Sequence, residues 1–213
     1  MPLVKTLLFD PQTTILVWKI TESYETLSEQ IVLKEESKTR MEGMKSELHQ
    51  RAFLSVRMIL QQQGYTDFDL FYDAFGKPHL VDGKHISISH SHEWATVIIS
   101  DKITGIDIEM QREKIIKIAS KFVLSELDFL PTTSPSDYIK KLTVIWGIKE
   151  SIFKIRNEIG ISFKDHIQTH PFELTDNQGT AQLFFENKTH NFKFYFLEIE
   201  QFTLVYAFSQ FQN

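Results

Sequence analysis

The stretch T-G-I-D-I-E at Thr104–Glu109 and the stretch W-G-I-K-E-S-I-F-K at Trp146–Lys154 determine how the rest of this sequence is interpreted. In the first stretch, apolar and acidic residues alternate. This alternation predicts a β-strand in which Asp107 and Glu109 leave the same face. An element that packs on that face therefore meets two carboxylates.

The second stretch has helical spacing, because Trp146, Glu150 and Lys154 are four residues apart and so lie on one ridge. Lys149 stands one position round from Glu150. Three carboxylates and two lysines from the two stretches suit a hard divalent cation and a phosphate-bearing ligand, since Mg²⁺ prefers a few carboxylates together with phosphate oxygens and waters. Taken singly, the charged residues of either stretch are more often ordinary solvent-exposed surface charges. Gly147 weakens the helix, which predicts close packing at that position.

The composition is that of a globular protein, because 42% of the 213 residues are hydrophobic and 18 are Phe. The absence of Cys excludes a disulfide framework and a thiolate zinc site. The first residues lack the apolar core of a signal peptide, and no apolar run approaches the roughly 18 to 20 residues of a membrane span. We therefore expect a soluble cytoplasmic protein without a membrane partner. The net charge of −5 argues against nucleic acid as a partner.

The spacing of apolar residues predicts an α+β chain. Strands are expected at residues 4–9, 14–20, 68–71, 85–89, 94–100, 104–109, 183–185, 191–197 and 202–208. Helices are expected at residues 22–33, 35–63, 113–120 and 137–157, and the second of these has the strongest helical signal. No tandem repeat of residue type is visible. The order of strands, long helix and strands nevertheless occurs twice, before and after about residue 100.

The stretch H-I-S-I-S-H-S-H at residues 85–92 predicts a strand that runs into a polar tip, which suits a ligand-binding edge. Its histidines His85, His90 and His92 also permit a zinc site. The nearby turn with Lys77 and the acidic strand favour the first interpretation. The helix predicted at 35–63 carries basic residues whose ordinary role is a solvated face, namely Lys38, Arg40, Lys45, Arg51 and Arg57.

Together these stretches resemble the signature of the 4′-phosphopantetheinyl transferases, a G-[IV]-D-x-E strand followed by W-x-x-K-E-[AS]-x-x-K, with G-K-P and S-[IL]-S-H-S before them. Every fixed position is present, and the order and spacing agree. The chain resembles the larger, surfactin-synthetase-activating type over nearly its whole length. The resemblance implies two similar halves, residues 1–102 and 103–213, each with an antiparallel sheet packed on a long helix. It also implies a monomer with internal pseudo-twofold symmetry and an active site in the seam between the halves.

The resemblance implies a Mg²⁺-dependent transfer of the phosphopantetheine arm of coenzyme A, the co-substrate, to a serine of an apo acyl or peptidyl carrier protein. The expected by-product is adenosine 3′,5′-bisphosphate. The metal ligands carried over are Asp107, Glu109 and Glu150. The expected coenzyme A contacts are Arg51, Arg57, Lys77, Ser89, His90, Lys149 and Lys154. The first half is thus expected to supply phosphate contacts and the second half the metal and catalytic groups.

The expected catalytic residues are Glu126, Lys149, Glu150 and Lys154. Glu126 belongs to K-F-V-L-S-E, which resembles the family's F-[LS]-x-x-E segment, although relatives place one more residue between the Phe and the Glu. The proton acceptor for the serine is either Glu126 or a metal-bound water, with Glu113 and Asp128 as weaker alternatives.

Two further alternatives stay open. A chain that kept coenzyme A or nucleotide affinity and lost catalysis would act as a binding partner, although three mutually repelling carboxylates have no physical purpose in a retired site. For docking of the carrier protein, Lys114, Lys117 and Lys121 recur along one helix face. A merely solvated lysine stripe explains the same pattern.

Overall fold

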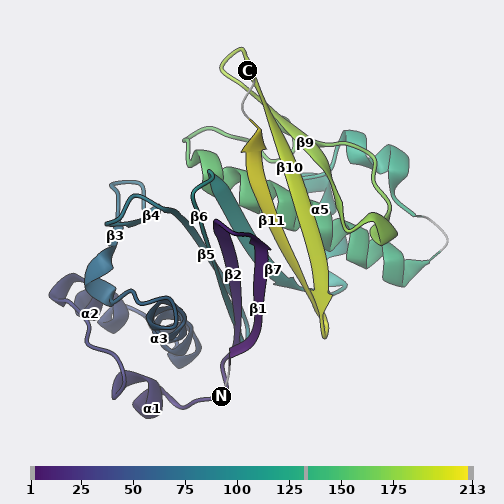
Figure 1. Cartoon of the computed structure of the whole chain (residues 1–213). Coiled ribbons are helices and arrows are strands. Elements are labelled where there is room, and N and C mark those ends of the chain that lie inside the picture. The colour runs from purple at the N-terminus through teal and green to yellow at the C-terminus, as the bar shows by residue number, and fades with distance from the viewer. Residues whose placement is uncertain (1–2, 132–133, 211–213) are drawn as a thin grey trace. The chain divides into compact units, whose positions relative to one another are not determined.

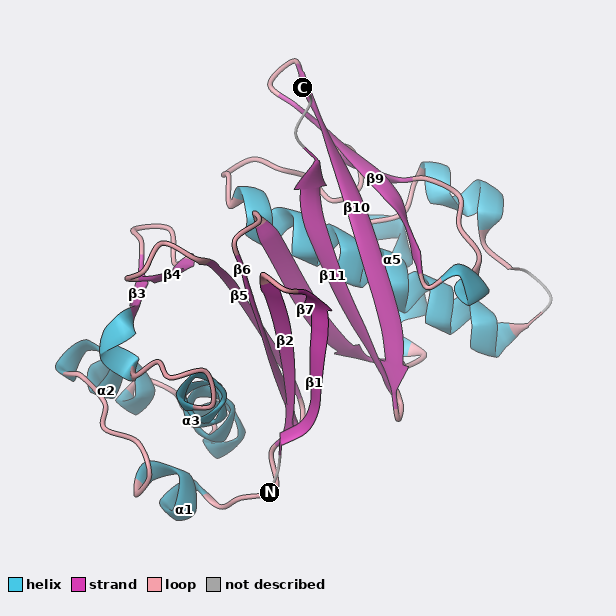
Figure 2. Ribbon diagram, in the orientation of Figure 1, coloured by secondary structure: helices cyan, strands magenta, loops and turns pink. Residues whose placement is uncertain are grey.

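The computed structural model describes residues 3–131 and 134–210. The chain divides into two compact units, Met1–Lys102 and Ile103–Asn213, and each combines an antiparallel sheet with helices (Figures 1 and 2). The α+β class predicted from the sequence is confirmed. No helix within the described ranges is long and apolar enough to cross a membrane.

The N-terminal unit is built on a four-stranded antiparallel sheet with the order β1-β2-β6-β5. These strands are β1 (Leu3–Asp10), β2 (Thr13–Lys19), β5 (His85–Ser91) and β6 (Trp94–Ser100). The helices α1 (Tyr24–Ser28), α2 (Glu35–Glu42) and α3 (Glu47–Gln61) lie on one side of the sheet (Figure 1). A short 3₁₀ turn at Asp67–Asp69 leads into a small hairpin of β3 (Leu70–Tyr72) and β4 (Pro78–Leu80). The apolar face of α3 packs on the sheet, with Leu54, Ile59 and Leu60 fully buried.

The single helix predicted at 35–63 is wrong, because the structure breaks it into α2 and α3. Gly43 ends α2, and glycine is the ordinary residue that weakens a helix. The Gln50 side chain donates to the carbonyls of Met41 and Met44 at 3.4 and 3.2 Å, which satisfies backbone groups that the break exposes. Met41 and Met44 also pack against the core of this unit.

The C-terminal unit has a five-stranded antiparallel sheet with the order β7-β11-β10-β9-β8. The strands are β7 (Thr104–Met110), β8 (Ile167–Thr169), β9 (Gln178–Phe185), β10 (Lys188–Ile199) and β11 (Phe202–Gln210). One long helix, α5 (Pro135–Arg156), packs along β7 and β11. Between β7 and α5 lie α4 (Lys114–Ile118) and 3₁₀ turns at Ala119–Lys121 and Ser125–Phe129, and a further 3₁₀ turn spans Leu174–Asp176.

Two glycines let α5 approach the sheet closely. A Cβ atom at Gly105 would lie 2.1 Å from the carbonyl oxygen of Ser151, and one at Gly147 would lie 2.6 Å from Cγ2 of Val205. Neither position tolerates a side chain without movement of the helix. The close packing that the sequence predicts at Gly147 is confirmed.

Candidate active site in the C-terminal unit

Strand β7 directs its acidic face toward α5. Asp107 follows Gly105 on that face, and a Cβ atom at Gly147 of α5 would lie 3.8 Å from its Oδ2 atom. Helix α5 is fixed at both ends: the Ser134 side chain accepts a hydrogen bond from the Asp137 N–H at 3.3 Å, and Asn157 ends the helix in the left-handed region at φ 51°. A helix held in this way presents its functional side chains at defined positions on the strand.

The strand and the helix are joined by an ion pair. The ammonium of Lys154 lies 2.8 Å from Oδ1 of Asp107 and donates to the carbonyl of Ile106 at 2.9 Å. Asp107 is 5% exposed. The lysine therefore supplies a positive charge at a carboxylate that is almost withdrawn from solvent.

Glu150 takes part in the same electrostatic cluster. Burial raises the pKa of Glu150 to about 7, and the negative charge of Asp107 adds to this effect, while Lys154 opposes it and Glu109 contributes in the same direction as Asp107. The other two predicted metal ligands, Asp107 and Glu109, thus lie within the electrostatic reach of Glu150. Their mutual repulsion favours a bound cation.

Within residues 3–131 and 134–210, no group of three His, Asp or Glu residues is arranged so as to hold a metal ion. The chemistry of the donor set fits a hard cation all the same, since it consists of carboxylate oxygens from two elements. The metal ligand set of Asp107, Glu109 and Glu150 stays a prediction.

The raised pKa of Glu150 predicts a dependence of stability on pH. The folded state holds the proton of Glu150 more tightly than the unfolded state does. The stability that this difference contributes is fully present below about pH 4.5 and is lost as the pH rises through about 7. In metal-free protein, Glu150→Gln should exceed the wild type by about 1 to 3 kcal/mol in free energy of unfolding at pH 8, and the two should converge near pH 5. Urea unfolding at several pH values measures this difference. The matched control is Glu36→Gln, which removes a carboxylate from an exposed side chain of α2 and should leave the pH slope unchanged. If the free energies of unfolding of wild type and Glu150→Gln change with pH in parallel, Glu150 does not have a raised pKa.

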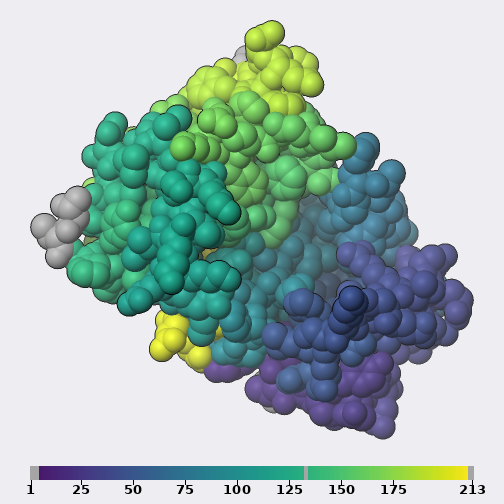
Figure 3. Space-filling view, turned by 180° about the vertical axis from the view of Figure 1, so that it is seen from behind, coloured from purple at the N-terminus to yellow at the C-terminus, as the bar shows by residue number. Residues whose placement is uncertain are grey.

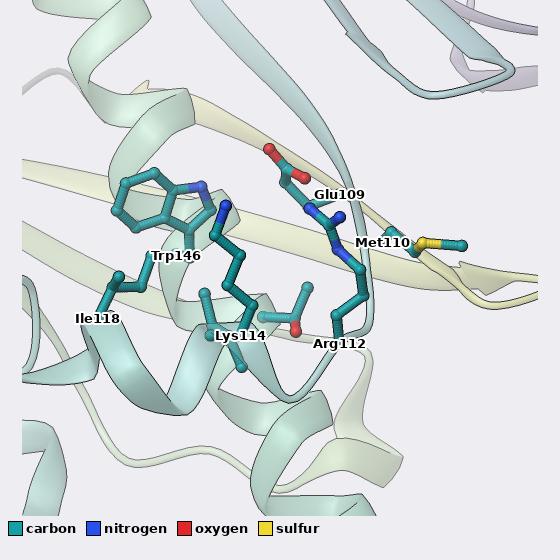
Figure 4. Close-up of a pocket in the computed structure, with 8 residues that line it drawn as sticks. Glu109, Met110, Arg112, Lys114, Ile118 and Trp146 are labelled. Carbon is teal, nitrogen blue, oxygen red and sulfur yellow. The ribbon is translucent and has the colours of Figure 1, made fainter.

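A pocket of about 150 Å³ opens beside the end of β7 (Figure 4). Its lining combines apolar and charged side chains from β7, α4 and α5: Glu109, Met110, Arg112, Lys114, Ile115, Ile118, Thr143 and Trp146. In Figure 4 the side chains of Glu109 and Arg112 point toward one another, and Lys114 extends along Trp146. The pocket brings a predicted metal ligand next to two cationic side chains. Such a lining suits a ligand with an apolar chain and an anionic group.

The sequence did not indicate Arg112 or Thr143 as site residues. Nothing in their local pattern marks them, since they become neighbours only when α5 packs beside the end of β7. Trp146 packs against Phe122 and Phe163, with ring centroids 5.1 and 5.5 Å apart. It therefore has the core role that helps to seat α5, and one edge of it also lines the pocket.

Two predicted catalytic residues need correction, because Glu126 and Lys149 are bound to each other inside the unit. Their side chains are 1% and 0% exposed, and Nζ of Lys149 lies 2.7 Å from Oε1 of Glu126. The Lys149 ammonium also donates to the carbonyls of Phe122, Phe163 and Ile167, at 2.6, 2.9 and 2.6 Å. All three of its N–H donors are thus engaged within the protein, so the prediction that Lys149 contacts phosphate is not retained.

The carboxylate of Glu126 is equally occupied. Oε1 accepts from the N–H of Thr169 at 3.0 Å and Oε2 accepts from that of Leu124 at 3.1 Å. A base that accepts a proton from a substrate must be accessible to that substrate, and the side chain of Glu126 is buried. The pair instead ties α5 to the loop before it and to β8.

A family model described as the 4′-phosphopantetheinyl transferase superfamily matches residues 103–208, a range that contains β7, α5 and this pair. The chain belongs to the 4′-phosphopantetheinyl transferase superfamily. Curated relatives agree. A "4′-phosphopantetheinyl transferase gsp" of Aneurinibacillus migulanus is 32% identical over 117 residues, which cover 54% of this chain and 47% of the relative. A "4′-phosphopantetheinyl transferase" of Bacillus subtilis is 32% identical over 83 residues, which cover 38% of this chain and 37% of the relative.

The chain thus spans about half the length of the first of these phosphopantetheinyl transferases and about a third of the second. The family match lies in the C-terminal unit, where the metal ligands were predicted.

In the N-terminal unit of this superfamily member, Arg57 has a structural role, and its predicted contact with coenzyme A is not retained. Its guanidinium is 2% exposed and lies 2.9 Å from Oδ1 of Asp67, which also accepts from the hydroxyl of Ser37 at 3.0 Å. Arg57 also stacks over the ring of Phe53, with its Cζ atom 3.4 Å from the ring centroid. A buried and paired guanidinium cannot reach a ligand in solvent.

Arg51 needs a similar correction, because it donates from Nε and Nη2 to the carbonyls of Glu22 and Ile20, at 2.8 and 3.2 Å. These bonds tie α3 to the segment after β2. A phosphate contact would have to use the remaining Nη1 edge, so Arg51 is not retained as a principal ligand of coenzyme A.

The other predicted contacts lie on or near β5. His90 is exposed at the end of the strand, whereas Ser89 is buried, and the two residues project from opposite faces of the strand. Lys77 is partly buried in the turn between β3 and β4. The alternative of a zinc site does not fit this geometry, because His85 and His90 also leave opposite faces, about 16 Å apart along the strand.

Proposed function

We propose that this protein transfers the 4′-phosphopantetheine moiety of coenzyme A to a serine of an apo acyl or peptidyl carrier protein, in a Mg²⁺-dependent reaction that releases adenosine 3′,5′-bisphosphate. The observation that carries the proposal is the joint position of Asp107, Lys154 and Glu150 on β7 and α5, within the range that matches the family. The names of the two curated relatives support it.

In this proposal Asp107, Glu109 and Glu150 hold Mg²⁺. The bound ion would neutralise charge on the pyrophosphate of coenzyme A. Lys154 pairs with Asp107 and is partly exposed, with 27% of its side chain accessible, so it can also donate to a phosphate oxygen. The pocket lined by Trp146, Arg112 and Lys114 would receive the part of the substrates next to the reacting groups.

The proposed function is tested by mass spectrometry. Purified protein, coenzyme A, Mg²⁺ and an apo carrier protein from the same host should give a carrier whose mass has risen by one phosphopantetheine group. A carrier in which alanine replaces the acceptor serine should keep its mass. Tight coenzyme A binding without any mass change on the host's carrier proteins would reject the transferase and favour a coenzyme A-binding partner protein.

We place docking of the carrier protein on α4 and the turns that follow it. Lys117 and Lys121 are exposed there, together with apolar side chains that are unusually accessible: Ile116 at 43%, Leu124 at 54% and Leu127 at 59%. In the space-filling view of Figure 3, this segment is teal and lies on the visible surface. Lys114 lines the pocket, so we assign only two of the three lysines predicted from the sequence, Lys117 and Lys121, to the docking surface.

Reversal of both charges, Lys117→Glu with Lys121→Glu, should raise KM for an acidic carrier protein by up to about tenfold and leave the affinity for coenzyme A unchanged. The defect should shrink at high salt, because the screening length falls to about 3 Å in 1 M salt. Steady-state kinetics at two ionic strengths measure both effects. The control is Lys5→Glu with Lys188→Glu, which changes the net charge equally at exposed lysines elsewhere. Equal defects in the two double variants, or a loss of coenzyme A affinity in the first, would reject this docking surface.

A further inference from the structure

The turn that carries Lys77 is built around one carboxylate. Residues 73–77 join β3 to β4, and Asp73 lies at the first position of this connection. Oδ1 of Asp73 accepts from the backbone N–H of Phe75 and from that of Lys77, each at 2.9 Å. The backbone adds two bonds, from Asp73 N–H to the Lys77 carbonyl and from Gly76 N–H to the Asp73 carbonyl, both at 3.0 Å.

Gly76 completes the turn, with a φ of 81° that an L side chain rarely adopts. The loop therefore has one conformation in which the N–H groups of residues 75 and 77 converge on a single oxygen. Without that oxygen, two backbone donors would lose their partner, and the position of Lys77 would rest on the hairpin strands alone.

The second oxygen of Asp73 is also engaged, since Oδ2 lies 3.1 Å from Nε2 of His79. His79 is opposite Phe71 in the strand pairing and stacks on its ring, with centroids 5.3 Å apart and planes at 19°. The hydrogen bond to His79 and those from the backbone hold the pKa of Asp73 below its ordinary value. Asp73 is therefore a carboxylate that links the turn to the strand after it.

The start of β5 lies close to this turn. Burial lowers the pKa of His85, and the charges of Lys77 and His79 lower it further, which places both of them near the start of β5. Asp101 acts in the opposite direction. The ammonium of Lys77 attracts phosphate, and a carboxylate beside it weakens that attraction. The presence of Asp73 there is explained by the backbone groups that it holds.

We propose that Asp73 is a positioning residue for coenzyme A: its carboxylate fixes the turn of residues 73–77 and so holds Lys77 where it binds a phosphate group of the ligand. The inference rests on the proposed function, because coenzyme A supplies the phosphate. Asp73 itself does not contact the ligand. It acts through Lys77.

The test measures binding of coenzyme A and of adenosine 3′,5′-bisphosphate by calorimetry. Asp73→Ala should weaken the affinity for both ligands about tenfold, the loss expected for one charge-assisted contact that is no longer held in place. Asp73→Asn keeps a side-chain oxygen that can accept from both N–H groups, so it should bind within about threefold of the wild type. Asp82→Ala is the matched control. Asp82 accepts from the N–H of Lys84 at 3.1 Å in the next turn and should leave both affinities unchanged.

The decisive comparison is a double-mutant cycle with Lys77→Ala. If Asp73 acts through Lys77, then Asp73→Ala should cause no further loss of affinity once Lys77 is alanine. The same tenfold loss in both backgrounds would show a general weakening of the unit and overturn the inference, as would wild-type affinity in Asp73→Ala. A wild-type protein that does not bind coenzyme A at all overturns the proposed function, and the inference with it.

Discussion

Replacement of Lys149 by methionine should lower the free energy of unfolding by about 3 to 5 kcal/mol, because it leaves the carboxylate of Glu126 buried without its cation. It also removes the ammonium that donates to the carbonyls of Phe122, Phe163 and Ile167. Urea unfolding followed by circular dichroism measures the loss.

The matched control for this experiment lies on the same helix. Lys140 pairs with Glu198 at 3.0 Å, with side chains 30% and 46% exposed, so Lys140→Met should cost less than about 1 kcal/mol. The double variant Lys149→Met with Glu126→Leu removes both charges, and it should recover part of the stability lost by the single variant. If Lys149→Met is as stable as Lys140→Met, the pair does not anchor α5.

Loss of a predicted metal ligand should have the largest effect on the reaction. Asp107→Asn and Glu150→Gln preserve side-chain shape, yet each should reduce phosphopantetheine transfer by at least about 100-fold at saturating coenzyme A, since even residues that only orient a ligand cost 10- to 100-fold. Transfer is measured as mass gained by the carrier protein per unit time. The melting temperature shows that the variants are folded.

Glu36→Gln provides the control for these two variants, because it removes one carboxylate from an exposed side chain of α2. It should transfer at the wild-type rate. Turnover near the wild-type rate in Asp107→Asn or Glu150→Gln at saturating Mg²⁺ would show that the ligand set has been assigned wrongly.

The sequence could predict the elements of the candidate site because they depend on local periodicity. The alternation of apolar and acidic residues in Thr104–Glu109 corresponds to β7. The spacing of four residues within Trp146–Lys154 corresponds to the second half of α5. The break between α2 and α3 could not be predicted in the same way. It depends on Gln50, which satisfies the carbonyls of Met41 and Met44 only after the chain has turned back.

The buried ion pairs could not be predicted either. Glu126 and Lys149 are 23 residues apart in the sequence, and Arg57 and Asp67 are 10 apart, so nothing local indicates that they meet. A charged residue in or beside a motif predicts a ligand contact, whereas the surroundings of Lys149 and Arg57 in the folded chain give them a structural role. Distances and burial distinguish these two roles, and residue type does not.

The two glycines between α5 and the sheet have a consequence for mutational tolerance. At Gly105 the backbone of Ser151 lies directly against β7, so main-chain contact limits how closely β7 and α5 approach at that point. Any larger residue at Gly105 or Gly147 must push the helix outward, and a displacement of about 1 Å can reduce catalysis about 100-fold. Gly105 and Gly147 can therefore determine the distance between the proposed reacting groups without contacting a substrate. A substitution that spares every charged residue can therefore still reduce the proposed transferase activity by changing that spacing.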